Sequence, residues 1–281
     1  MAKQANDTPQ QDPTQEKLRA ALEGIDRRIV VFSGKGGVGK TTVSVNLAYA
    51  LAELNLAVGL FDADVTGPNV AQMTGVSDPA TVRGGRSVPH LAHGIHVVSI
   101  ATMLPPDAPV IWRGPMRSRA IEELLTETAW GNVDTLVADL PPGTGDEVLT
   151  IAQRVRPQLA VIVTTPQSVA RGDARRAVGF AKKLEIPQIG LVENMSGLVC
   201  PHCGEAIDVF GTGTTLADAR ELGVEHFGAL PMDPTVPTES DTGAPAILAR
   251  PHSALADEMR RIARLIAERL EGASAPSATG S

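Results

Sequence analysis

One glycine-rich segment, residues 33–42, constrains the fold of this chain more than any other feature of its sequence. It reads Ser-Gly-Lys-Gly-Gly-Val-Gly-Lys-Thr-Thr and joins an apolar run, 29–32, to a helical pattern that begins near Lys40. This spacing is that of a P-loop, in which backbone N–H groups and a helix N-terminus surround phosphate oxygens. A glycine-rich turn without a ligand is the alternative, and the strand-then-helix context argues against it. The residues expected to bind a nucleotide here are Gly34, Lys35, Gly36, Gly37, Val38, Gly39, Lys40, Thr41 and Thr42.

Three side chains of this segment have distinct predicted roles. Lys40 suits the β- and γ-phosphates, and the Thr41 hydroxyl suits a magnesium ion, which prefers oxygen ligands. Lys35 follows the first glycine directly and separates the segment from an ordinary Walker A motif. In this respect the segment resembles the deviant Walker A of MinD/ParA-type ATPases, which implies that Lys35 is catalytic and reaches the nucleotide of a facing subunit. A solvated loop lysine is the other interpretation.

Length and composition limit the classes of protein to which this chain can belong. The chain has 281 residues, 43% of them hydrophobic and 20% charged, which is typical of one globular α/β domain. The formal charge of −7 gives no electrostatic reason to expect nucleic acid or an anionic membrane as the main partner. Two cysteines do not make a disulfide framework, and no stretch has the length and apolarity of a signal peptide core or membrane span. These features predict a cytoplasmic protein.

Apolar strands alternate with helical patterns along the chain, which predicts a doubly wound, mostly parallel sheet with helices on both faces. We expect a flexible polar leader (1–26), an ATPase domain (27–271) and a disordered tail (272–281), with a short helix at 17–24. Apolar residues of the 253–270 helix form one stripe, which favours docking on the sheet over a membrane-binding helix. Strands are predicted at 27–33, 57–62, 94–100, 134–140, 159–165, 188–194 and 226–230, and the other helices at 42–54, 116–128, 146–155, 168–184 and 215–222.

Acidic residues end two of the predicted strands. Asp62 and Asp64 follow the second strand, where a carboxylate can position water for attack on the γ-phosphate; we assign that catalytic role to Asp64 and support near magnesium to Asp62. Asp139 follows another apolar run, 136–138, as in a Walker B motif, and is predicted to hold magnesium with Thr41. A turn that merely caps the second strand is the alternative for Asp62 and Asp64.

Two further elements follow the strand at 188–194. The Asn194 amide offers a donor and an acceptor, which is the combination needed to bind the edge of an adenine, although a strand-ending turn would also use asparagine. Cys200 and Cys203 have a spacing that lets two thiolates point at one metal. They supply half of a four-thiolate site, so a symmetric dimer is the simplest completion. A pair of free thiols is the alternative.

Together these motifs resemble one family closely. The segments at 34–42, 62–69, 112–116, 139–146, 194–197 and 200–203 look like those of the Mrp/ApbC iron–sulfur cluster carrier ATPases, relatives of MinD and ParA, over about 27–270. The resemblance implies a homodimer that binds a 4Fe–4S cluster across its interface, binds and hydrolyses ATP, and passes the cluster between an assembly scaffold and apo-proteins. Asn69 departs from the serine expected in many relatives.

Two other functions stay open at this stage. A MinD/ParA-type positioning ATPase would need a membrane or DNA partner, and a structural ATPase dimer could hold one zinc ion through its four cysteines. His90, His93 and His96 have the spacing of a metal patch but lie in a Pro-interrupted loop that leads into a strand, so we do not expect them to bind metal. The residues leave the role of Arg113 undecided between the nucleotide, a partner and an ion pair.

Overall fold

A computed structural model describes residues 13–103, 114–200, 202–203, 205–211 and 213–274. Its centre is an eight-stranded sheet in the order β12-β9-β8-β1-β7-β2-β6-β5. Neighbouring strands are parallel except for β5, which runs antiparallel to β6 at one edge. The strands are β1 (Arg27–Phe32), β2 (Val58–Asp62), β5 (His90–Ala92), β6 (Ile95–Ser99), β7 (Thr135–Asp139), β8 (Leu159–Thr164), β9 (Gln188–Glu193) and β12 (Glu225–Ala229).

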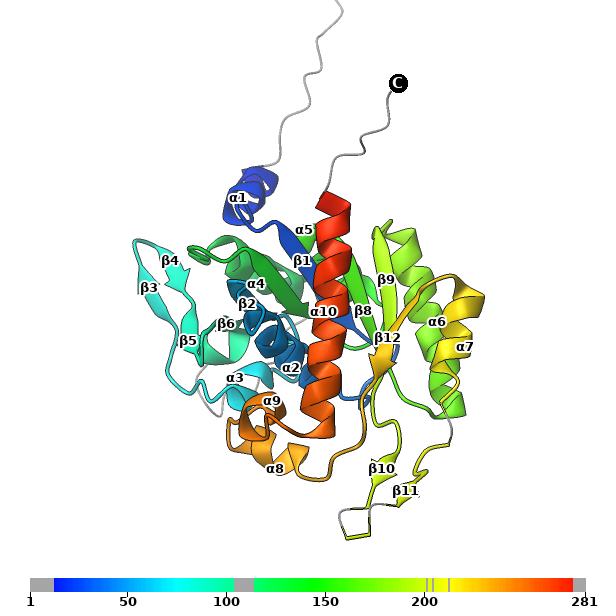
Figure 1. Cartoon of the computed structure of the whole chain (residues 1–281). Coiled ribbons are helices and arrows are strands. Elements are labelled where there is room, and N and C mark those ends of the chain that lie inside the picture. Colours follow the sequence, from blue (N-terminus) through cyan, green and yellow to red (C-terminus); the bar gives the residue numbers. More distant parts are fainter. Residues whose placement is uncertain (1–12, 104–113, 201, 204, 212, 275–281) are drawn as a thin grey trace, which may run out of the picture.

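Helices cover both faces of this sheet (Figure 1). One core cluster joins the sheet to α2, α3, α9 and α10, and the other joins it to α1, α4, α5, α6 and α7. The helices are α1 (Pro13–Ala21), α2 (Lys40–Ala52), α3 (Val70–Met73), α4 (Gly114–Thr126), α5 (Asp146–Val155), α6 (Ser168–Lys183), α7 (Thr215–Leu222), α8 (Val236–Asp241), α9 (Ala246–Ala249) and α10 (Ala254–Ser274). A doubly wound, mostly parallel α/β fold is thus confirmed.

Strand β1 shows why its residues are almost uniformly apolar. Successive side chains of a strand point to opposite faces, so Ile29 and Val31 enter one core cluster while Val30 and Phe32 enter the other. Because both faces are covered by helices, all four side chains are fully or almost fully buried. The P-loop that follows is therefore anchored to the centre of the molecule.

The first and last helices differ from their predicted bounds. The structure begins α1 at Pro13, and Leu18, Leu22 and Ile25 are buried in the core, so this part of the expected leader packs on the domain. The α10 helix continues through residues 272–274, which the sequence assigned to the tail. Its apolar stripe is buried against the sheet and α2, as predicted (Figure 1): Leu255, Met259, Ile262, Ile266 and Leu270.

Two small hairpins lie outside the main sheet. One pairs β3 (Thr81–Arg83) with β4 (Arg86–Val88), and the other pairs β10 (Leu198–Val199) with β11 (Ala206–Ile207). The second projects from the lower edge of the molecule in Figure 1, the edge to which the carboxyl ends of the parallel strands point. A short 3-10 helix (Ile100–Met103) follows β6.

Candidate functional site

The P-loop (33–39) connects β1 to α2 and is fixed by contacts from distant parts of the chain. The Asn194 side-chain amide donates to the Val38 carbonyl oxygen at 2.9 Å. Gly39 has φ of 78°, and a Cβ there would collide with the Asn194 amide, so glycine is required for both conformation and space. Gly34 lies against the Asp173 carbonyl group of α6, where a Cβ would also collide. The loop is therefore held from two sides.

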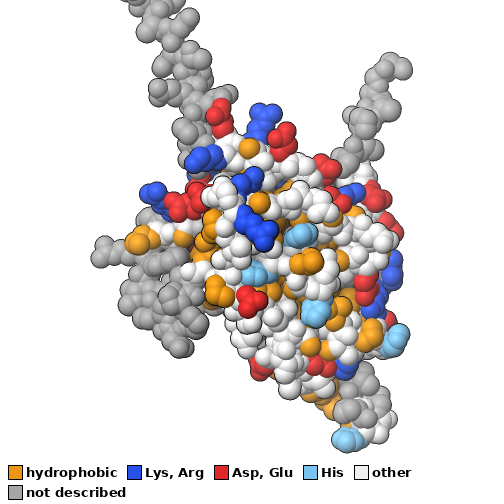
Figure 2. All heavy atoms as spheres, turned by 90° about the vertical axis from the view of Figure 1, so that its left-hand side faces the viewer, with side chains coloured by type: hydrophobic (Ala, Val, Ile, Leu, Met, Phe, Trp, Pro, Cys, Tyr) orange, Lys and Arg blue, Asp and Glu red, His pale blue; other side chains and the backbone are white. Residues whose placement is uncertain are grey.

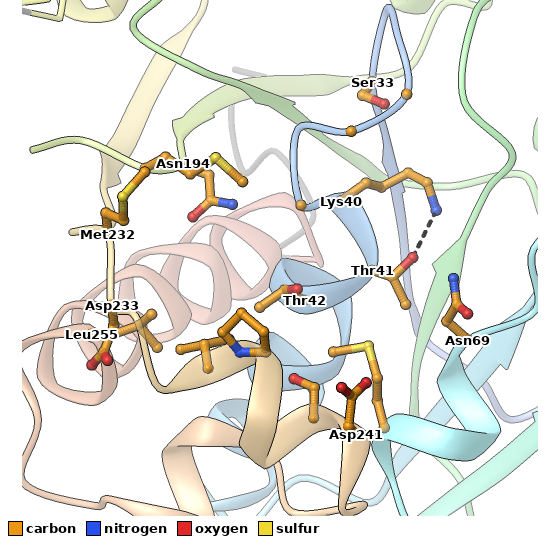
Figure 3. Close-up of a pocket in the computed structure, with 18 of the residues that line it drawn as sticks. Ser33, Lys40, Thr41, Thr42, Asn69, Asn194, Met232, Asp233, Asp241 and Leu255 are labelled. Atoms are coloured by element: carbon orange, nitrogen blue, oxygen red, sulfur yellow. Dashed lines mark hydrogen bonds between the residues drawn. The ribbon is translucent and has the colours of Figure 1, made fainter. Parts of the chain in front are cut away.

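Asp139 is the acceptor at the centre of the site. It is fully buried, and its carboxylate binds Lys40 Nζ at 2.7 Å, the Thr41 hydroxyl at 2.7 Å and the Ser44 hydroxyl at 2.6 Å. Figure 3 shows Lys40 and Thr41 side by side, with Lys40 Nζ 3.3 Å from Thr41 Oγ1. The predicted magnesium ligands Thr41 and Asp139 are thus adjacent, and an oxygen-binding cation would compete with Lys40 for the same carboxylate.

A second buried carboxylate, Asp62, lies directly opposite Asp139 in the register of β2 and β7. Burial, and then the nearby Asp139 charge, raises the pKa of Asp62 to about 7. The Ser99 hydroxyl donates to Asp62 Oδ2 at 2.8 Å, and the Val70 N–H group donates to the same oxygen at 3.3 Å. Asp62 therefore lies beside Asp139 on the neighbouring strand, where its charge can affect a cation bound to the Asp139 carboxylate.

Asp64 lies two residues after the end of β2, on the wall of the cavity described below. Its Oδ1 atom accepts hydrogen bonds from the Thr66 hydroxyl at 2.7 Å, the Thr66 N–H group at 3.2 Å and the Gly67 N–H group at 3.3 Å. These contacts fix the orientation of the carboxylate. The position suits the predicted water-positioning role, which stays a prediction.

A cavity of about 590 Å³ opens beside the P-loop, which is large enough for a nucleotide. Figure 3 shows Lys40 and Thr41 on one side of it, Asn194, Met232 and Leu255 on the opposite side, and Asp241 at the bottom of the view. Lys35 is half-buried and is not part of the cavity wall, so its predicted role towards a facing subunit stays a prediction. Asn69, Gln72, Met73 and all residues of the segment 231–237 except Thr235 also line the cavity.

The two cysteines lie on the β10–β11 hairpin. Cys203 is exposed, Cys200 is half-buried, and neither forms a disulfide. Hydrogen bonds from the N–H groups of Cys203 and then His202, and a contact with the Cys203 thiol, lower the pKa of the Cys200 thiol. The hairpin turn therefore brings the two sulfur atoms together and favours the thiolate, the form that binds metals.

The histidines with the spacing of a metal patch do not gather at one site. The pairing of β5 with β6 aligns His96 with Leu91, so His90 and His96 point to opposite faces of the sheet. Histidine side chains on the face shown in Figure 2 are spaced apart by other residues. Within the described ranges no group of three or more His, Cys, Asp or Glu side chains could hold a metal ion. Arg113 lies outside the described residues.

Sequence reasoning missed two residues that orient the acids. Ser44 and Ser99 are fully buried and donate to Asp139 and Asp62 respectively. Ser44 lies four residues after Lys40 on the same helix, so helical periodicity could have placed it beside the P-loop lysine. Ser99 ends β6, and strand order was needed to place it next to β2.

Fold and site together define a P-loop NTPase of the MinD/ParA type. The family model for the ParA group described as NUBPL iron-transfer P-loop NTPase matches residues 24–267. The chain belongs to this family of iron-transfer P-loop NTPases.

Similar proteins are found among characterised sequences and structures. An iron–sulfur cluster carrier protein of Pyrococcus horikoshii is 44% identical over 254 residues, covering 84% of each chain. The iron–sulfur cluster transfer protein NUBPL of Dictyostelium discoideum is 43% identical, covering 90% of this chain and 79% of the relative. A nucleotide-binding protein of Archaeoglobus fulgidus, solved in complex with ADP, has a TM-score of 0.73 and 37% identity, covering 82% of this chain and 91% of its own.

A more distant structure supports the fold alone. The cell division ATPase MinD of Pyrococcus furiosus has a TM-score of 0.65 at 23% identity, and the match covers 87% of this chain and 99% of MinD. In the part of the chain that the structure describes, no helix combines the length and apolarity needed to cross a bilayer.

Proposed function

We propose that this protein is an ATP-binding and ATP-hydrolysing carrier of iron–sulfur clusters, which holds a 4Fe–4S cluster between two subunits and transfers it to apo-proteins. The observation that carries the proposal is the position of Cys200 and Cys203, on a hairpin whose base is bonded to Met232, a residue that lines the cavity beside the P-loop. The relatives named as iron–sulfur cluster carriers support the cargo.

The nucleotide half of the proposal rests on the contacts around Asp139. ATP would place its phosphates against the P-loop backbone and Lys40. Magnesium would bind the Thr41 hydroxyl and the Asp139 carboxylate, whose Oγ1 and Oδ2 atoms lie 2.7 Å apart. It would neutralise phosphate charge during hydrolysis. Asp64 would orient the attacking water, and Lys35 would reach the nucleotide of the partner subunit.

The cluster half rests on ligand number. One hairpin supplies two thiolates, whereas a 4Fe–4S cluster requires four ligands. A homodimer that brings two hairpins together supplies all four. The exposure of Cys203 would allow such an approach and would allow release of the cluster to an apo-protein.

Coupling between the two halves would pass through the base of the hairpin. The Ser196 N–H group donates to the Leu230 carbonyl oxygen at 2.9 Å, and the Met232 N–H group donates to the Gly197 carbonyl oxygen at 2.8 Å. Leu198 also forms an isolated parallel bridge with Met232, which lines the cavity. A nucleotide that displaces the Met232 segment would therefore move the backbone that leads to Cys200.

The test is anaerobic reconstitution of the full chain with iron and sulfide, followed by metal and sulfide analysis and measurement of mass in solution. We expect about four iron and four sulfide ions per dimer and transfer of the cluster to an apo-protein. A Cys200→Ala, Cys203→Ala variant should lose both, while a His202→Ala variant should retain both. Zinc bound tightly by the dimer without any cluster would refute the carrier function and favour a zinc-linked ATPase dimer.

A further inference from the structure

A third buried carboxyl group, at the end of β9, has no role in the site described above. Glu193 is 3% exposed, and its side chain forms no ion pair within the described ranges. Burial of a carboxylate is costly unless hydrogen-bond donors replace its hydration. Two hydroxyls do so here: Ser196 Oγ donates to Glu193 Oε1 at 2.6 Å, and the Thr215 hydroxyl donates to Glu193 Oε2. Glu193 is therefore satisfied only while both hydroxyls stay in place.

The two donors lie on either side of the cysteines in the chain. Ser196 precedes the β10–β11 hairpin, and Thr215 begins α7, which follows the hairpin. Cys200 and Cys203 lie between them. The two oxygens of one carboxyl group thus join the two ends of the segment 196–215. Joining the ends of a loop reduces the number of arrangements that the loop can adopt.

The packing around this carboxyl group is close. A Cβ at Gly213 would collide with both Glu193 carboxyl oxygens, so a glycine lets the returning chain reach them. The hairpin itself is short, because β10 pairs with β11 at Leu198–Ile207 and Val199–Ala206. A two-stranded hairpin is at best marginally stable alone. The orientation of the cysteines therefore depends on contacts at the base of the hairpin.

The residue after Glu193 holds the nucleotide loop. Asn194 donates to the Val38 carbonyl oxygen of the P-loop, and its own N–H group donates to the Thr164 carbonyl oxygen of β8 at 2.8 Å. The end of β9 thus contacts the cysteine segment through one side chain and the P-loop through the next. We propose that Glu193 is a positioning residue that sets the orientation of the cysteine hairpin relative to the P-loop and thereby strengthens retention of a cluster. This inference rests on the carrier function proposed above.

The first test uses the full chain without metal, so it does not depend on a cluster. Hydrogen exchange followed by mass spectrometry reports on the hairpin amides, among them the Cys200 N–H group, which donates to the Glu205 carbonyl oxygen at 2.9 Å. Thr215→Val and Ser196→Ala each remove one donor to Glu193. Each should speed exchange of these amides at least about fivefold, as loss of one hydrogen bond to a charged group implies.

Two control variants separate the contact with Glu193 from general effects of substitution. Thr215→Ser retains a hydroxyl and should restore wild-type exchange. Thr128→Val removes a buried hydroxyl that donates to the Leu124 carbonyl oxygen after α4, so it should leave exchange of the hairpin amides unchanged. An equal increase in exchange at β1 in Thr215→Val would show general destabilisation and would overturn the local role of Glu193.

The second test measures retention of the cluster directly. After anaerobic reconstitution, the visible absorbance should fall at least about threefold faster in excess EDTA for Thr215→Val and Ser196→Ala than for the wild type, because freer thiolates hold the cluster less well. Thr215→Ser should again match the wild type. Unchanged exchange in both donor variants, or faster exchange with unchanged cluster loss, would overturn the positioning role while leaving the carrier function intact. Failure of the wild-type chain to bind a cluster would instead refute the carrier function, and with it the role of Glu193 in retention.

Discussion

Ser44→Ala tests whether the buried serine holds the Asp139 carboxylate in place. The substitution removes the 2.6 Å hydrogen bond to Asp139 Oδ1 at a fully buried position, where water cannot replace the lost donor. A hydrogen bond to a charged group contributes about 1.5–3 kcal/mol, so the free energy of unfolding should fall by roughly that amount. Equilibrium urea denaturation followed by circular dichroism measures the loss.

The same substitution has a second readout at the proposed magnesium site. Residues that orient a metal ligand commonly change metal affinity by about 10–100-fold, so Mg²⁺ affinity in the presence of ADP should fall within that range. Thr150→Ala is the matched control, because that hydroxyl also bonds within a helix but is exposed and has a neutral backbone acceptor. Loss of less than about 0.5 kcal/mol in Ser44→Ala, with unchanged Mg²⁺ affinity, would show that Ser44 does not support Asp139.

Three other predictions address the loop, the buried acid and the thiol. Gly39→Ala should reduce ADP affinity at least about tenfold in calorimetry, because φ of 78° and the Asn194 contact leave no room for a Cβ; wild-type affinity would contradict this. The free energy of unfolding of Asp62→Asn, relative to that of the wild type, should increase as pH rises from 5 to 8. The reason is that the Asp62 carboxyl, with its pKa raised to about 7, binds more protons in the folded state than in the unfolded state, so the wild-type protein loses stability as pH rises. Parallel curves of stability against pH for the two proteins would refute this. Iodoacetamide should alkylate Cys200 with a pH midpoint below that of an ordinary thiol, because neighbouring N–H groups lower its pKa, and a midpoint at or above the ordinary value would exclude that effect.

Regular elements of the fold were predictable because their physical signals are local. The β8 strand is apolar on both faces, and α5 begins at Asp146 after a glycine-rich turn, so both were placed to within one residue. The short β5 strand was missed because it has three residues and pairs as an antiparallel edge, which leaves little periodicity. Helices α8 and α9 are short and follow prolines, so they resemble a loop in sequence.

In the candidate site, too, local motifs were predictable, whereas contacts between distant segments were not. Motif spacing singled out the P-loop and Asp139 separately, and the structure brings them together, because Lys40, Thr41 and Ser44 all contact the Asp139 carboxylate. Asn194 was predicted to bind an adenine edge, yet one of its amide donors holds Val38, 156 positions earlier, and its role towards the base stays a prediction. Sequence alone could not reveal this contact, since it depends on how β9 lies relative to the P-loop.

The position of β1 also affects how the chain folds during synthesis. Its two partners in the sheet are β7 and β8, so the strand that carries the P-loop pairs with segments that begin more than a hundred residues later. At about 5–20 residues per second, a ribosome needs on the order of 5–20 s to reach β7 after β1. During that interval an apolar strand has no sheet partner. A chaperone that binds nascent apolar segments would find β1 exposed until β7 emerges from the ribosome.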